Sequence, residues 1–189
     1  TATPLPDGYR TAGLSMRTRS ADSTAVEEAA RLLREAERPL AIVGSAAAWS
    51  AAGDALAAFA EGTGCPVLLS SQGRGCLDES HPLVFGESHI PTNPISRLAL
   101  AEADVILFAG ERVDDRVEFA ASDAVNPEAK IIQIWPKAED IGINRSIEVG
   151  LVSDTRAGLE DLLAAYDENG TDTRDEWVAR LRTEKDAEL

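Results

Sequence analysis

The segment richest in side chains that could do chemistry begins where an apolar run, residues 105–109, ends at Gly110. Five charged residues occupy the next six positions: Glu111, Arg112, Asp114, Asp115 and Arg116. If this segment turns into a helix, its two arginines face the same side and can clamp a phosphate or carboxylate with their forked guanidinium groups. The alternative is a network of arginine–aspartate ion pairs that fixes the loop and adds little stability if exposed. A metal held by the two aspartates is disfavoured, because both arginines would compete for the same oxygens.

The other residue types that commonly perform catalysis are few and isolated. His81 and His89 are the only histidines, and neither has a matched nucleophile or second metal ligand. Cys65 and Cys76 have no metal-binding or redox spacing, so reduced thiols are expected. Neither the G-x-G-x-x-G dinucleotide fingerprint nor the G-x-x-x-x-G-K-[ST] phosphate loop occurs in the chain. We therefore predict no catalytic residue and no metal site, and a hydrolase acting alone is the least favoured class.

Short apolar segments alternate with amphipathic ones along the chain. Apolar runs predict strands at residues 39–44, 65–71, 104–110, 129–135 and 147–154. Helical periodicity predicts helices at residues 24–38, 49–64, 96–103 and 155–168, the first opened by the capping-box spacing of Thr24 and Glu27. The strands show no polar alternation, which indicates burial on both faces. We expect a doubly wound, mostly parallel, Rossmann-like α/β sheet with helices on both faces.

The ends of these strands are where a ligand is expected, because open parallel sheets bind ligands beyond the carboxyl ends of their strands. Small or amide residues stand at three such ends, residues 44–46, 70–73 and 110–112, whereas Trp135 stands at a fourth. Small residues allow a ligand to approach the backbone, whose N–H groups can hold phosphate. The pattern favours a nucleotide-like ligand.

Composition narrows the possible partners and the organisation of the chain. A net charge of -15 repels phosphate backbones and anionic lipid, so neither nucleic acid nor a membrane is an expected partner. We predict a linker or arm at residues 1–22, one domain at residues 23–168, and a charged helix or linker outside the core at residues 169–189. The missing initiator Met fits a processed chain or a fragment, and the cytoplasm is the expected location.

The charged segment also resembles part of a known family. Residues 103–117, "ADVILFAGERVDDRV", are similar to a segment of thiamine-diphosphate-dependent enzymes that ends G-x-R-x-D-D-R-V. Residues 37–88, 129–144 and 149–163 resemble further segments of these enzymes in the same order. The resemblance is to the central domain, most like that of acetolactate (acetohydroxyacid) synthase. It implies a six-stranded parallel sheet that binds FAD in the synthases and holds ADP, coenzyme A or nothing in relatives.

The resemblance also implies which residues would contact a cofactor. Gly44 and Ser45 would approach the pyrophosphate. The flavin or ribityl side would be lined by Ser70, Ser71 and Gln72, with Gly86 close by. Four more contacts would come from the end of the third strand: Gly110, Arg112, Asp114 and Arg116. Two departures leave open whether FAD, an ADP-like nucleotide or nothing binds: the first glycine cluster is reduced to residues 44–46, and residues 135–138 replace the usual D-x-D-P segment.

The family's catalytic groups lie in other domains. Its catalytic glutamate and its G-D-G…N motif for Mg²⁺ and diphosphate have no counterpart in this sequence. The resemblance implies that thiamine diphosphate and Mg²⁺ bind only in the parent's pyrimidine-binding and diphosphate-binding domains. This chain would assemble with those domains in a homo-oligomeric transferase or lyase and would be structural and inactive alone. The alternative is a free-standing nucleotide-binding or interaction module of the same fold.

Overall fold

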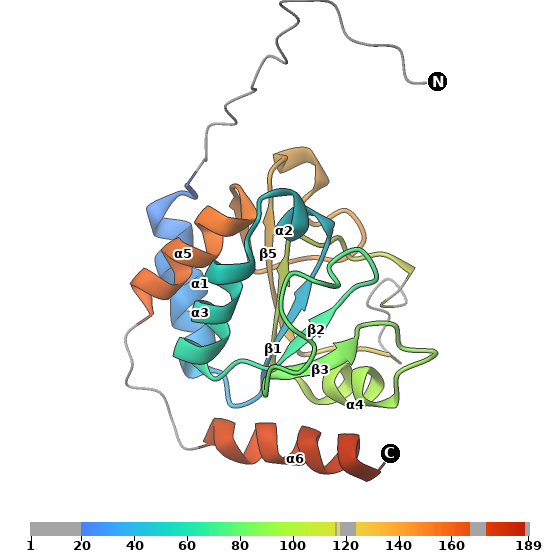
Figure 1. Cartoon of the computed structure of the whole chain (residues 1–189). Coiled ribbons are helices and arrows are strands. Elements are labelled where there is room, and N and C mark those ends of the chain that lie inside the picture. Colours follow the sequence, from blue (N-terminus) through green and yellow to red (C-terminus); the bar gives the residue numbers. More distant parts are fainter. Residues whose placement is uncertain (1–19, 116, 118–123, 167–172, 188–189) are drawn as a thin grey trace, which may run out of the picture.

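The computed structural model describes residues 20–115, 117, 124–166 and 173–187. Within these residues one parallel sheet contains six strands: β1 (Pro39–Val43), β2 (Val67–Leu69), β3 (Val84–Glu87), β4 (Val105–Ala109), β5 (Lys130–Trp135) and β6 (Val149–Val152). The strand order is β3-β2-β1-β4-β5-β6, with β1 and β4 at the centre (Figure 1). Every neighbouring pair is parallel. The predicted doubly wound α/β fold is confirmed.

Helices cover both faces of this sheet. One face is covered by α1 (Ser23–Glu35), α3 (Gly53–Thr63) and α5 (Thr155–Ala165), and α5 packs against both of the other helices (Figure 1). The short helix α2 (Ser45–Trp49) follows β1 directly and contacts α5. On the other face α4 (Pro94–Glu102) and α6 (Thr173–Ala187) contact each other and β3. A 3₁₀ turn, η2 (Ala138–Asp140), follows β5.

Two helix boundaries differ from the sequence-based expectation. The side chain of Asp22 accepts hydrogen bonds from the backbone N–H groups of Thr24 and Ala25, both at 3.1 Å. Asp22 is therefore the N-cap of α1, in place of the expected Thr24. The helix expected over residues 49–64 begins only at Gly53, because Trp49 is the last residue of a separate helix and the chain turns at Ala51, whose φ is 50°.

The sheet separates two apolar cores, since successive strand residues point to opposite faces. Val43 and Leu107 are fully buried under α1, α3 and α5. Their neighbours Ile42 and Phe108 are fully buried on the face covered by α4 and α6. Burial on both faces explains why the strands read as unbroken apolar runs.

The charged C-terminal tail contributes to the second core. Trp177 and Leu181 of α6 are buried there, and the indole N–H of Trp177 donates to Pro39 O at 3.0 Å. The buried guanidinium of Arg174 donates to Leu33 O and Thr63 O, two carbonyls at the carboxyl ends of α1 and α3. A cation at such an end satisfies carbonyls that the helix leaves unpaired. The expectation that the tail lies outside the core is therefore wrong for α6.

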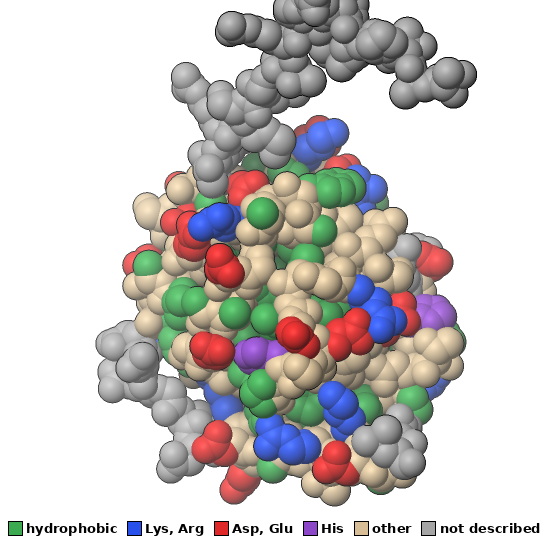
Figure 2. Space-filling view, in the orientation of Figure 1, with side chains coloured by type: hydrophobic (Ala, Val, Ile, Leu, Met, Phe, Trp, Pro, Cys, Tyr) green, Lys and Arg blue, Asp and Glu red, His purple; other side chains and the backbone are tan. Residues whose placement is uncertain are grey.

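The surface combines both signs of charge. On the face shown in Figure 2, acidic and basic side chains are interspersed, so the negative net charge does not form one continuous field there. Among the described helices, none combines the length and the apolar character that a membrane span requires.

Candidate functional site

Two glycines mark the centre of the carboxyl edge of the sheet. Gly44 follows β1 and Gly110 follows β4, and the connections from these neighbouring strands run to opposite sides. Such a switch point is where open α/β sheets commonly bind ligands. Here backbone hydrogen bonds bridge the two segments, from Gly44 N to Ala109 O at 3.1 Å and from Ala46 N to Gly110 O at 3.0 Å. The protein's own backbone therefore bridges the space between Gly44 and Gly110, which is called the switch-point crevice below.

Gly110 lies where the surrounding elements pack closely. Its φ is +65°, a region that favours glycine. A Cβ added there would lie 2.6 Å from Ala47 N and 2.6 Å from Thr155 Oγ1. Thr155 is buried, and its hydroxyl has no hydrogen-bond partner among the described residues. The first turns of α2 and α5 thus press directly on the end of β4.

The next residue, Glu111, occupies the space that Gly44 leaves by lacking a side chain. Glu111 is 7% exposed, and a Cβ added to Gly44 would overlap its carboxylate oxygen Oε2. Its other oxygen, Oε1, accepts a hydrogen bond from Arg112 N at 3.0 Å, and its carbonyl accepts one from Gln133 Nε2 at 3.2 Å. Sequence analysis counted Glu111 among the charges but did not identify it as a site residue. Its position immediately after a glycine that ends a strand was the available signal.

Arg112, the central residue of the expected cofactor clamp, is bound to protein groups. Its guanidinium donates to Asp140 Oδ2 at 3.0 Å and lies 4.8 Å from the centre of the Trp135 ring. The indole N–H of Trp135 donates to the same carboxylate oxygen at 2.9 Å. Trp135 therefore joins Asp140 in fixing the arginine beyond the ends of β4 and β5. Arg116 lies outside the described residues, so the expected pairing of two arginines stays a prediction.

The predicted residues after β2 and in β3 lie on the other side of β1. Ser70 is 1% exposed, and its Oγ has no hydrogen-bond partner among the described residues. Ser71 and Gln72 are exposed at the surface of the loop that follows. Gly86, with φ +92°, lies in the edge strand β3. These four residues share the carboxyl edge with Gly44, and their contact with a cofactor stays a prediction.

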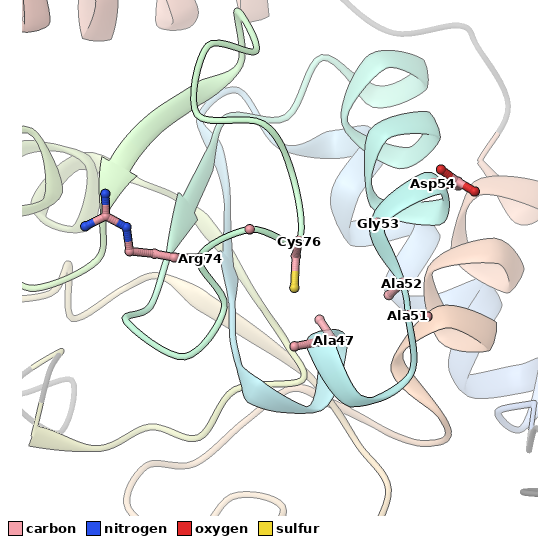
Figure 3. A pocket seen from close by; sticks show the side chains of 9 residues that line it. Ala47, Ala51, Ala52, Gly53, Asp54, Arg74 and Cys76 are labelled. Atoms are coloured by element: carbon pink, nitrogen blue, oxygen red, sulfur yellow. The ribbon is translucent and has the colours of Figure 1, made fainter.

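A pocket of about 350 Å³ lies between α2 and the loop that follows β2. It is lined by α2, the start of α3 and the loop after β2: Ala47, Ala48, Ala51, Ala52, Gly53, Asp54, Arg74, Gly75 and Cys76. In Figure 3 the thiol of Cys76 points toward Ala47, whereas Arg74 and Asp54 point away from the hollow. Burial raises the pKa of the Cys76 thiol, which favours its neutral form. The lining is therefore mostly methyl groups and a neutral thiol.

The two histidines lie at opposite ends of β3, since His81 precedes the strand and His89 follows it. His81 Nε2 is 3.2 Å from Glu61 Oε1, and His89 Nδ1 is 2.9 Å from Thr92 Oγ1. His81 thus contacts a residue of α3, and His89 contacts a residue of its own turn.

The pyrophosphate of FAD or of an ADP-like nucleotide does not fit at Gly44 in this arrangement. Glu111 lies where the ligand would approach Gly44, and its negative charge would face a second negative charge. The nearby N–H groups of Ala46 and Arg112 already donate to protein oxygens. Arg112, the expected counter-charge, is bound to Asp140.

Comparison with known proteins identifies the family. A family model described as the thiamine pyrophosphate enzyme, central domain, matches residues 26–162. The acetolactate synthase large subunit of Corynebacterium glutamicum is 35% identical over 159 residues, which cover 83% of this chain and 25% of that protein. The 2-hydroxyacyl-CoA lyase 1 of Mus musculus is 35% identical over 147 residues, which cover 78% of this chain and 24% of that protein. The chain thus spans about a quarter of the length of these curated relatives.

A solved structure shares the fold. Benzoylformate decarboxylase from Polynucleobacter necessarius matches with a TM-score of 0.66 and 24% identity, over 88% of this chain and 31% of that chain. The family model runs from Val26 in α1 to Leu162 in α5 and so includes all six described strands. This chain therefore belongs to the central-domain family of thiamine pyrophosphate enzymes.

Proposed function

We propose that the chain is the architectural central domain of a thiamine-diphosphate-dependent carboligase or decarboxylase most like acetolactate synthase, and that it has no catalytic activity alone. The observation that carries the proposal is the match of residues 26–162 to the central-domain family, together with a relative of which the matched part makes up only 25%. Two well-packed cores and a sheet buried on both faces suit a rigid spacer between catalytic domains.

The parent's remaining domains supply the chemistry in this proposal. Thiamine diphosphate and Mg²⁺ bind between its pyrimidine-binding and diphosphate-binding domains, which pack against this one in a homo-oligomer. The nucleotide site that the resemblance implies, from Gly44 to Arg116, is vestigial at its pyrophosphate end. The buried Glu111 and the ion pair of Arg112 with Asp140 support that part of the proposal.

Turnover by the isolated chain is the direct test. Pyruvate is incubated with the 189-residue chain, thiamine diphosphate and Mg²⁺, and released CO₂ is measured alongside binding of thiamine diphosphate by calorimetry. We expect neither binding nor CO₂ release. Thiamine-diphosphate-dependent loss of pyruvate would overturn the claim that the chain is inactive alone.

The coding sequence on either side tests the parentage. We expect the same reading frame to encode a pyrimidine-binding domain with a catalytic glutamate upstream, and a G-D-G…N motif downstream. Stop and start signals at these ends, combined with binding of ADP by the chain, would instead support a free-standing nucleotide-binding module.

A further inference from the structure

We propose that Glu111 is an internal anion that occupies the switch-point crevice and excludes nucleotide pyrophosphates from this domain. The inference rests on one part of the proposed function, the vestigial pyrophosphate end, and deepens it by naming the residue responsible; it holds whatever reaction the parent catalyses. It follows from where the carboxylate lies, which backbone donors surround it, and where the guanidinium of the next residue, Arg112, is held.

The position of the carboxylate is the first argument. Gly44 has φ -126°, a value that other residues adopt freely, so its backbone conformation does not require glycine. What requires glycine is space: a Cβ would overlap Glu111 Oε2 and would lie 2.6 Å from Gly110 O. In other nucleotide-binding folds, a glycine at this point allows the backbone to approach a pyrophosphate. In this domain, Gly44 instead makes room for the carboxylate of Glu111.

The backbone donors are the second argument. A bound phosphate is held by N–H groups that lack protein acceptors. At this crevice Arg112 N donates to Glu111 Oε1, Ala46 N donates to Gly110 O, and Gly44 N donates to Ala109 O. These three donors already have protein acceptors, one of which is the carboxylate of Glu111. An entering phosphate would have to displace that carboxylate to gain even one of these bonds.

The distribution of charge is the third argument. Arg112 directly follows Glu111, yet its guanidinium is 3.0 Å from Asp140 Oδ2 and stacks over Trp135. The Asp140 carboxylate is held there by the indole N–H of Trp135 as well. The carboxylate of residue 111 therefore points into the crevice, whereas the guanidinium of residue 112 points to its rim. Arg112 is therefore not placed to attract an anionic ligand into the crevice, and the side chain of Glu111 fills the space that such a ligand would need.

The test measures ADP binding by isothermal titration calorimetry to the whole chain and to three variants. Glu111→Ala removes both the charge and the volume, and Glu111→Gln removes the charge while keeping the shape and an oxygen for Arg112 N. Glu139→Ala is the matched control, because it removes one exposed negative charge from the same edge without opening the crevice. Circular dichroism and the melting temperature establish that each variant is folded.

We expect Glu111→Ala to bind ADP at least about tenfold more tightly than the unaltered chain, and Glu139→Ala to bind like the unaltered chain. Tighter binding by Glu111→Gln as well would identify charge as the cause, and tighter binding by Glu111→Ala alone would identify volume; either supports the proposal.

If Glu111→Ala does not fold, Glu111→Gln must show the gain in ADP affinity by itself. Equal affinity of the unaltered chain and the folded variants would overturn the proposal, and so would the absence of any gain. Neither result depends on turnover of pyruvate or on the flanking coding sequence, so failure here is distinct from failure of the proposed parentage and of the claim that the chain is inactive alone.

Discussion

The two sides of α2 differ sharply although both lie beyond the end of β1. Toward β4, the backbone of α2 presses on Gly110 and the carboxylate of Glu111 fills the space at Gly44. Toward β2, the same helix borders a pocket of about 350 Å³ lined by alanine methyl groups and Cys76. A glycine at a strand end can therefore serve close packing of the protein against itself as readily as approach of a ligand. Only the neighbours of the missing Cβ distinguish the two uses.

Alanine substitutions at two glycines with similar backbone conformations should give the largest difference between these regions. Gly110 and Gly75 have φ of 65° and 86°, but a Cβ at Gly110 would lie 2.6 Å from Ala47 N, whereas one at Gly75 would meet nothing within 4 Å. Gly110→Ala should cost about 2–4 kcal/mol of unfolding free energy, from backbone strain and overpacking together. Gly75→Ala should cost about 1 kcal/mol, from strain alone.

Denaturant unfolding of the two variants provides the measurement, with the midpoint and the slope fitted separately. Equal losses of stability would mean that the backbone conformation alone sets the cost and that the switch point is no more tightly packed than the pocket rim.

The contact between Gly44 and Glu111 should give the next largest effect. Gly44→Ala should destabilise the fold by about 1–3 kcal/mol through overpacking. Adding Glu111→Ala should recover part of that loss, because one of the two obstructing groups is then gone while Gly110 O remains. We expect a coupling free energy of about 1 kcal/mol in the double-mutant cycle. Strictly additive losses would show that the carboxylate does not lie against Gly44.

Two arginines, one on each side of α2, offer a smaller contrast. Arg112→Ala removes an ion pair to the half-buried Asp140 and a cation–π contact with Trp135 and should cost about 1 kcal/mol. Arg74→Ala removes only an exposed ion pair with Glu79 and should leave the melting temperature unchanged. A clear loss of stability in Arg74→Ala with none in Arg112→Ala would contradict the view that the region beside β4 is held more firmly than the pocket rim.

The fold could be predicted from sequence because unbroken apolar runs identify strands buried on both faces. β3 could not be found in this way, since its four residues, VFGE, are too few for a periodic signal and end in a half-buried glutamate. The C-terminal helix was misplaced because its charge dominates its composition. Only a few of its residues, Trp177, Val178 and Leu181, bring it into the apolar core.

The candidate site was harder to predict, because its character depends on contacts between residues far apart in sequence. Nothing local to Arg112 indicates that its partner is Asp140, which lies beyond a whole strand. Glu111 resembles any surface glutamate until the end of β1 is placed beside it by the parallel pairing of β1 with β4. The strand ends were predictable from local pattern, and the closure of the crevice between them was not.

The smallest effect is on the labelling of the two cysteines. It also tests whether the pocket beside α2 and the crevice at Gly44 are independent. Desolvation raises the pKa of the fully buried Cys65 to about 12 and also raises that of the half-buried Cys76. Iodoacetamide reacts with the thiolate, so a raised pKa moves the rise in labelling to a higher pH than that of a free cysteine. At pH 8 the native chain should gain one label, at Cys76, and the denatured chain two, as counted by intact mass and peptide mapping. Labelling of Cys65 in the native chain would show that the core opens on the timescale of the reaction.

Because the Cys76 thiol points toward Ala47 on the pocket side of α2 (Figure 3), its label should leave ADP binding by Glu111→Ala unchanged. Loss of that binding on labelling would mean that the ligand extends across α2, so that the pocket and the crevice form one site.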